Sequence, residues 1–319
     1  MWYKKLLILI PLLFIVACGT TDDEYTQVTL VLDWTPNTNH TGFFVAMERG
    51  YFAEEGIQLE IIQPPEDGAI LLVAAGHAQF GISFQEELLL AANSPHAPIP
   101  VSAIAALASY NTSGILSLAE HNITRFRDLE GATFGSWMIP LFDEIVRESV
   151  RMDGGNPDLV TFVPHMALDN ITGIEREFDA TWVFEGWDLV MAGEMGMDTN
   201  FFLFRDVNPV FDYYTPVLIA HNDDLDSTLT QRFMRASARG FAFARDNYAQ
   251  AAEILHRHAP EMDLDILTAS QRFLSGVYFG ANRWGYIDTN RWNAFFYWMR
   301  DHEFIPANAQ YRAFLNISQ

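Results

Sequence analysis

The residues best suited to chemistry lie in one short stretch near the start of the chain. Asp33, Trp34, Asn37 and His40 fall within eight positions, directly after a β-rich run at residues 28–32. In open α/β sheets, ligands bind beyond the carboxyl ends of the strands. An aromatic face with a few directional polar groups predicts a pocket for a flat heterocycle. The alternative is a purely structural capped turn, with Trp34 in the core.

Other suitable side chains follow later predicted strands or lie where the chain is expected to cross between lobes. We select as further candidates for ligand contact Phe84, Gln85, Asn111, Trp182, Phe184 and Glu185. Glu185 would supply a second carboxylate, although a surface acid after a strand is the alternative interpretation. Phe84 and Gln85 could equally begin a helix. Trp182 and Phe184 are aromatic groups on which a flat ring could stack.

Several kinds of chemistry receive no support from the sequence. The nine histidines show no metal-ligand spacing, and we predict no metal and no cofactor. There is no glycine-rich phosphate loop of the P-loop type, so energy for any transport must come from a partner. The formal net charge of −22 offers no basic face for nucleic acid and favours solubility.

The amino terminus has the pattern of a secretory signal. Lys4 and Lys5 precede an apolar run at residues 6–16, which is too short to cross a bilayer, and Ala17 precedes Cys18. The four residues 15–18, Ile-Val-Ala-Cys, resemble the bacterial lipoprotein cleavage site, and Cys18 is the one cysteine of the chain. We therefore expect a signal peptide at residues 1–17, lipid attachment at Cys18 and a polar tether at residues 18–26. The alternative is an ordinary signal with an incidental cysteine.

Strand-like and helix-like segments alternate through most of the remaining chain, which indicates an α/β fold with mostly parallel sheets covered by helices. The length allows two domains with separate cores. We expect one lobe from residues 27–110 plus 215–319 and the other from residues 111–214. The predicted strands are 28–32, 57–62, 80–84, 100–107, 132–135, 159–163, 179–184 and 215–220, and the predicted helices are 43–51, 67–75, 86–92, 140–152, 167–176, 227–246, 248–258, 263–276 and 288–302.

The string at residues 33–42, Asp-Trp-Thr-Pro-Asn-Thr-Asn-His-Thr-Gly, closely resembles the signature of the thiamine-pyrimidine precursor family. That family contains substrate-binding proteins of ABC transporters for a formylated aminopyrimidine and fungal enzymes that make the pyrimidine. Further matches cover about residues 27–220. They lie at residues 48–57, 81–83, 128–131, 179–180 and 185–186.

The resemblance implies a two-lobed periplasmic-binding-protein fold of type II with the ligand in the cleft. It implies that Asp33, Trp34 and Asn37 line one wall and Glu185 the other. A carboxylate can accept two hydrogen bonds from an aminopyrimidine edge once the ring nitrogen is protonated, and such charge-assisted bonds are strong. The chain departs from the family at Thr181, where members often carry an aromatic residue, so the second stacking partner stays open.

The implied partners are an ABC permease and its ATPase, with the protein anchored by lipid on the outer side of the cell membrane and expected to be a monomer. Three rival interpretations remain. The synthase needs a lysine for a Schiff base, and both lysines lie in the predicted signal. A sulfonate or nitrate binder needs a cationic or N–H-rich pocket, whereas Asp33 would repel an anion. Riboflavin or another flat heterocycle would suit the same aromatic and carboxylate groups.

Overall fold

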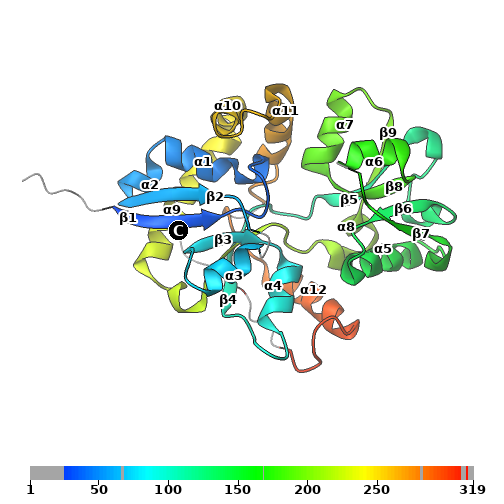
Figure 1. The fold of residues 1–319 in the computed structure, drawn as a ribbon, viewed down its shortest axis with the longest axis horizontal. Coiled ribbons are helices and arrows are strands. Elements are labelled where there is room, and N and C mark those ends of the chain that lie inside the picture. Colours follow the sequence, from blue (N-terminus) through cyan, green and yellow to red (C-terminus); the bar gives the residue numbers. More distant parts are fainter. Residues whose placement is uncertain (1–24, 66–67, 168, 281–282, 310–313, 315–319) are drawn as a thin grey trace, which may run out of the picture.

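The computed structural model describes residues 25–65, 68–167, 169–280, 283–309 and 314. Its strands form two separate five-stranded sheets, each covered by helices (Figure 1). The first sheet has the order β2-β1-β3-β10-β4. Its strands are β1 (Thr26–Val31), β2 (Ile57–Ile62), β3 (Phe80–Ser83), β4 (Val101–Ala106) and β10 (Val217–His221).

The second sheet has the order β7-β6-β8-β5-β9 and is built from the middle of the chain. One strand of each sheet runs antiparallel to its two neighbours: β10 in the first sheet and β5 in the second. The remaining pairs are parallel. The prediction of mostly parallel α/β sheets is therefore confirmed. The strands are β5 (Ser113–Leu118), β6 (Thr133–Ser136), β7 (Thr161–Pro164), β8 (Ala180–Phe184) and β9 (Thr199–Leu203).

Helices cover both faces of the first sheet (Figure 1). All six residues of β4 are buried, as expected for a strand that carries helices on both sides. The covering helices are α1 (Thr41–Glu48), α2 (Tyr51–Glu54), α3 (Gly68–Ala74), α4 (Gln85–Ala92), α9 (Thr228–Asp246), α10 (Tyr248–His258), α11 (Leu264–Ser275) and α12 (Thr289–Asp301).

The second sheet is covered by shorter helices, of which α5 (Pro140–Met152) is the longest. Pro140 occupies the first helical turn, where its missing N–H costs nothing, and the buried residues of α5 recur at helical spacing. The others are α6 (Asn170–Arg176), α7 (Val190–Glu194) and α8 (Phe204–Val207). A single π-helical turn, η5 (Glu185–Leu189), joins β8 to α7.

Two segments connect the lobes: residues 107–112 lead from β4 to β5, and residues 208–216 lead back to β10. The sequence missed β5 and β9, which pair antiparallel with each other.

The domain boundaries remain a prediction. Residues 1–17 and Cys18 lie outside the described residues, as does the predicted tether except for Tyr25 and Thr26, and Thr26 is already part of β1. Within the described part of the chain, no helix has the length and hydropathy needed to span a membrane.

Candidate functional site

Asp33 follows β1 and is held by a histidine that lies seven residues further along. His40 Nε2 lies 2.5 Å from Asp33 Oδ1, and His40 Nδ1 accepts the backbone N–H of Asn37 at 3.2 Å. Because Nδ1 is the acceptor, the neutral ring carries its proton on Nε2 and donates it to Asp33. His40 is fully buried, and the Asp33 side chain retains 9% of its exposure. One carboxylate oxygen is thus fixed by the protein.

Trp34 is the outward-facing group of this turn, with 63% of its surface exposed. Asn37, by contrast, is 8% exposed and works as a cap. Its side chain accepts the N–H of Asn39 at 2.9 Å and donates to the carbonyl of Thr35 at 3.1 Å. The alternative interpretation of Trp34 as a core residue is therefore wrong, while Asn37 serves the shape of the turn.

A second carboxylate lies near Asp33 on the same lobe. Glu87, in the first turn of α4, accepts a hydrogen bond from Ser83 at 3.0 Å. Loss of hydration raises the pKa of Glu87, the Ser83 hydroxyl lowers it, and the charge of Asp33 raises it further. Phe84 precedes α4 in an extended conformation and is half-buried. This edge of the first sheet therefore combines an exposed indole with two acids.

Glu185 begins the π-helical turn at the end of β8. Its backbone N–H donates to the carbonyl of Thr112 at 2.9 Å, which ties the turn to the crossover. Burial raises the pKa of Glu185, while Arg205 lowers it and Asp206 raises it. The guanidinium of Arg205 lies 3.9 Å from the centre of the Tyr110 ring, and the charge of Glu185 acts on that tyrosine too.

Four predicted ligand residues lie in the interior, and their ligand contact remains a prediction. Trp182 is 3% exposed and packs on Phe204 at 4.0 Å between ring centres, so it belongs to the core of the second lobe. His40 has both nitrogens occupied, as described above. The sequence could not distinguish these side chains from accessible ones, because strand ends carry both. The other two are Gln85 and Asn111.

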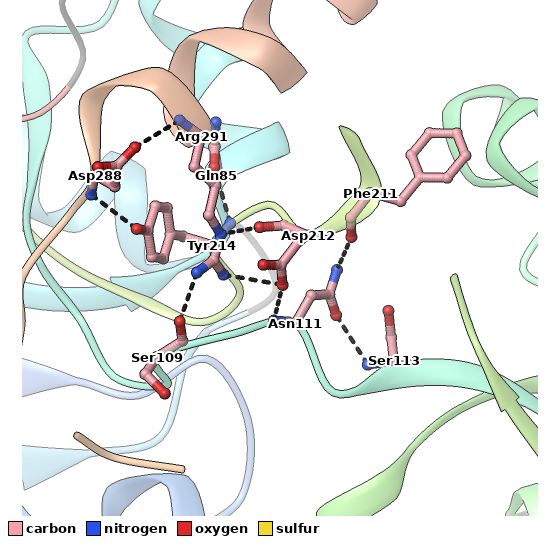
Figure 2. A network of polar contacts seen from close by, with 9 residues as sticks. All are labelled: Gln85, Ser109, Asn111, Ser113, Phe211, Asp212, Tyr214, Asp288 and Arg291. Atoms are coloured by element: carbon pink, nitrogen blue, oxygen red, sulfur yellow. Dashed lines mark hydrogen bonds and ion pairs between the residues drawn. The ribbon is translucent and has the colours of Figure 1, made fainter. Parts of the chain in front are cut away.

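Gln85 and Asn111 belong to the hydrogen-bonded network at the two crossovers (Figure 2). Gln85 accepts the N–H of Tyr214 at 2.9 Å and donates to the carbonyl of Trp292 at 3.0 Å. Asn111 donates to the carbonyl of Phe211 at 2.9 Å and accepts the N–H of Ser113 at 2.8 Å. Asn111 therefore joins the two crossovers to each other, and Gln85 ties the second crossover to α12.

Arg291 of α12 lies at the centre of this network (Figure 2). It donates to the carbonyl oxygens of Ser109 and Asp212, one from each crossover, and pairs with the Asp212 carboxylate at 3.2 Å. A cavity of about 140 Å³ lies against this network and is lined by Ser109, Tyr214 and Arg291 among others. None of the predicted ligand residues lines that cavity, so it is separate from the Asp33 and Glu185 walls.

Sequence reasoning missed several groups at the edges of the sheets. Glu87 and Arg205 gave no signal, because isolated charges on helices usually face solvent. Trp137 does follow a predicted strand, and it is 43% exposed. Its neighbour Met138 has a positive φ of 57° and donates its N–H to the Ser136 hydroxyl at 2.8 Å. These bonds give the loop after β6 a defined conformation with Trp137 at the surface. Phe184, at the end of β8, is half-buried.

A family model described as NMT1/THI5 like matches residues 37–251. The chain belongs to the NMT1/THI5-like family. It is 26% identical over 324 residues to a formylaminopyrimidine-binding protein of Halalkalibacterium halodurans, covering 95% of this chain and 94% of that protein. It is 23% identical over 246 residues to a 4-amino-5-hydroxymethyl-2-methylpyrimidine phosphate synthase of Legionella pneumophila, covering 74% and 75%. The resemblance inferred from residues 33–42 is thereby confirmed.

Solved structures show the same architecture at low sequence identity. The periplasmic aliphatic sulphonate binding protein SsuA of Escherichia coli aligns with a TM-score of 0.70 at 9% identity, over 92% of this chain and 93% of that one. The periplasmic nitrate-binding protein NrtA of Synechocystis PCC 6803 aligns with a TM-score of 0.66 at 13% identity, over 91% and 85%. At these identities the likeness establishes the fold, and the predicted type II periplasmic-binding fold is confirmed.

Proposed function

We propose that this protein is the solute-binding component of an ABC importer and that it binds a thiamine-precursor aminopyrimidine. The observation that carries the proposal is the Asp33 turn, in which a histidine-held carboxylate lies beside an exposed indole. The matched family and the similar formylaminopyrimidine-binding protein support the ligand class.

The chemistry of the two walls suits a flat ring that carries amino groups and a protonated nitrogen. Asp33 has one oxygen fixed by His40, which leaves the other to accept from the ligand. Glu185 would accept a second set of hydrogen bonds from the opposite lobe. Charge-assisted bonds of this kind are roughly twice as strong as neutral ones. Trp34 would stack on one ring face, and Phe84 and Phe184 would add apolar contact at the edges.

Ligand binding would shift the balance between open and closed lobes, because the closed state alone brings both walls to the ligand. We take the lobes as residues 27–110 plus 215–319 and residues 111–214. The closed form would deliver the ligand to a membrane permease driven by a separate ATPase. We also propose that residues 1–17 are removed, that lipid on Cys18 anchors the protein to the cell membrane facing the periplasm or the cell exterior, and that it is a monomer.

A binding role is favoured over pyrimidine synthesis by the residue types available. The chain has two lysines, Lys4 and Lys5, and both lie in the proposed signal peptide. A mature chain without lysine cannot form a Schiff base with an aldehyde cofactor. An anion ligand is disfavoured for a different reason, because Asp33 and Glu87 lie together on the first wall and would repel it.

The test is to identify small molecules that co-purify with the protein by mass spectrometry and then to titrate candidates by calorimetry. We expect binding of a formylated aminopyrimidine with a one-to-one ratio. Riboflavin is the second ligand to titrate, and an alkanesulfonate is the third. Tight binding of the sulfonate without binding of any pyrimidine would refute the proposal, and tight binding of riboflavin alone would replace the ligand but keep the role.

A further inference from the structure

Helix α11 carries a buried serine that contacts both lobes. Leu267 and Leu274 of α11 belong to the same core cluster as β1, so the helix is part of the first lobe. Ser270, on the same helix, donates its hydroxyl to the carbonyl of Gly186, which lies in the second lobe directly after Glu185. In Figure 1, α11 and α7 face each other across the gap between the lobes. The lobes are therefore joined by more than the two crossovers.

The same serine also reaches the turn that carries the first wall. Ser270 Oγ lies 2.6 Å from Thr38 Oγ1. A hydroxyl has one proton, and that of Ser270 is directed to Gly186, so Thr38 must be the donor in this second bond. Thr38 and Ser270 are 1% and 0% exposed, which leaves no water to replace either bond. The result is a continuous line of hydrogen bonds from Thr38 through Ser270 to Gly186.

Both ends of this line are held by further contacts. The carbonyl of Thr38 accepts the hydroxyl of Tyr278 at 2.6 Å, and Thr38 begins the short 3-10 turn that ends at His40. At the other end, a Cβ on Gly186 would lie 2.9 Å from the ring of Phe273, so α11 packs closely on the π-helical turn. Thr38 and Gly186 are therefore both held against the same helix.

We propose that Ser270 is a positioning residue that latches the lobes in the closed arrangement, by joining the turn after Asp33 to the turn that begins with Glu185. The inference rests on the proposed function, since the two turns are the two proposed walls. The bond to Gly186 crosses the lobes, whereas the bond to Thr38 does not. A movement that separates α11 from the π-helical turn would therefore break the Gly186 bond and leave the Thr38 bond in place.

The test compares Ser270→Ala with Ser237→Ala in the full chain. Ser237 is also fully buried on a helix of the first lobe, but its hydroxyl bonds to Phe233 within the same helix. Removal of the Ser270 hydroxyl should weaken binding of the formylated aminopyrimidine by about 5- to 30-fold, through faster dissociation. Ser237→Ala should leave the affinity within about twofold, because its bond does not cross the lobes.

A distance measurement tests closure without relying on the ligand. Cys18→Ser removes the one cysteine, which allows spin labels at Glu261→Cys in the first lobe and Met195→Cys in the second, two exposed positions. The measured quantity is the distribution of distances between the two spin labels. The fraction of molecules with the shorter distance should be smaller in Ser270→Ala than in the parent, and it should be unchanged in Ser237→Ala. Identical distance distributions for the parent and Ser270→Ala would overturn the latch.

The two proposals fail in different ways. If the parent binds no aminopyrimidine but Ser270→Ala still loses the short-distance population, the ligand assignment is wrong and the latch stands. If the parent binds aminopyrimidine and Ser270→Ala binds it equally well with the same distances, the latch is wrong and the ligand assignment stands. A parent that lacks the short distance both alone and with ligand would also overturn the latch.

Discussion

His40 acts on Asp33 and has no free nitrogen for a ligand. The N–H of Asn37 fixes its tautomer, and its other nitrogen fixes one oxygen of the carboxylate. At the scale of single residues, the proposed site is therefore a rigid acid beside an exposed indole, with a second acid in the proposed opposite lobe. This division between supporting and contacting residues determines which substitutions should affect binding.

We expect Asp33→Asn and Glu185→Gln each to weaken aminopyrimidine binding by about 10- to 100-fold, because each removes charge-assisted hydrogen bonds of about 1.5–3 kcal/mol. Calorimetry on the folded variants measures the effect. Asp223→Asn is the control, since its side chain is 90% exposed. Normal binding by both site variants would show that the two carboxylates do not contact the ligand.

The raised pKa of Glu185 predicts a pH dependence of binding. Burial raises this pKa above the ordinary 4.5, so on acidification the carboxylate takes up a proton earlier than a solvated glutamate would. If the ionised form binds, affinity should fall as the pH is lowered through the raised pKa, beginning above pH 4.5. Titrations at several pH values should show this fall in the parent and a flatter profile in Glu185→Gln. Because acidification also protonates the ring nitrogen of the ligand, the test compares the two proteins, and a ratio of their affinities that stays constant across the pH range would contradict the role of an ionised Glu185.

At the scale of elements, α4 contains an acid that the site does not use. Glu86 is 3% exposed, one of its oxygens has no hydrogen-bond partner among the described residues, and burial raises its pKa to about 8. The adjacent Gln85 on the same helix is also buried and is bonded to Tyr214 and Trp292. The first turn of α4 is thus fixed inside the protein by one neutral amide and one acid that folding keeps protonated.

Glu86→Gln should stabilise the protein at neutral and mildly basic pH. Above pH 4.5 the unfolded state loses its proton, while the folded state keeps it until about pH 8. The folded state then binds more protons, so the free energy of unfolding falls as the pH rises over this interval. We expect a gain on the order of 1–3 kcal/mol at pH 8 and little change near pH 4. Denaturant unfolding at both pH values measures it, with the exposed Glu253→Gln as the control; an equal gain at both would point to another cause.

The sequence predicted most elements because their hydrophobic periodicity is strong. The bounds expected for residues 57–62, 140–152 and 248–258 agree with the structure. It missed β9, and it missed β5 (Ser113–Leu118), which lies where the chain is expected to cross between the lobes. It placed Asp33, Trp34 and Glu185 at sheet edges correctly, but it could not tell that Trp182 faces the core. Side-chain direction at a strand end depends on tertiary packing, which a local pattern does not contain.

For the whole molecule, the relation between the lobes depends on two crossovers and on α11. Arg291 holds both crossovers from the first lobe through the carbonyl oxygens of Ser109 and Asp212 (Figure 2). The α11 contact lies on the opposite side of these segments from α12 (Figure 1). The crossovers held by Arg291 and the proposed latch at Ser270 are thus separate structures, and substitutions in them should have different effects.

Arg291→Ala should destabilise the fold, because it removes the ion pair with Asp212 and the donor to the carbonyl oxygens of both crossovers. We expect the free energy of unfolding to fall by about 1–3 kcal/mol, because a partly buried pair lies between the exposed and the fully buried cases. Arg300→Ala is the control, since it removes an exposed pair with Asp301 and should cost less than about 1 kcal/mol. Chemical unfolding of the three proteins makes the comparison. Equal stability of Arg291→Ala and the parent would show that the crossovers hold without the arginine.

The exposure of Trp34 also gives the protein a natural optical reporter. Trp182, Trp284, Trp292 and Trp298 are all at most 8% exposed, so their emission is set by the interior and should not respond to a solute. Trp34 emits from a watery environment, and a ring stacked on it would quench or blue-shift that light. Stopped-flow fluorescence of the unlabelled chain would therefore record ligand arrival in real time, with Trp34→Phe as the silent reference and with Trp137→Phe and Trp187→Phe to subtract the exposed Trp137 and the half-buried Trp187.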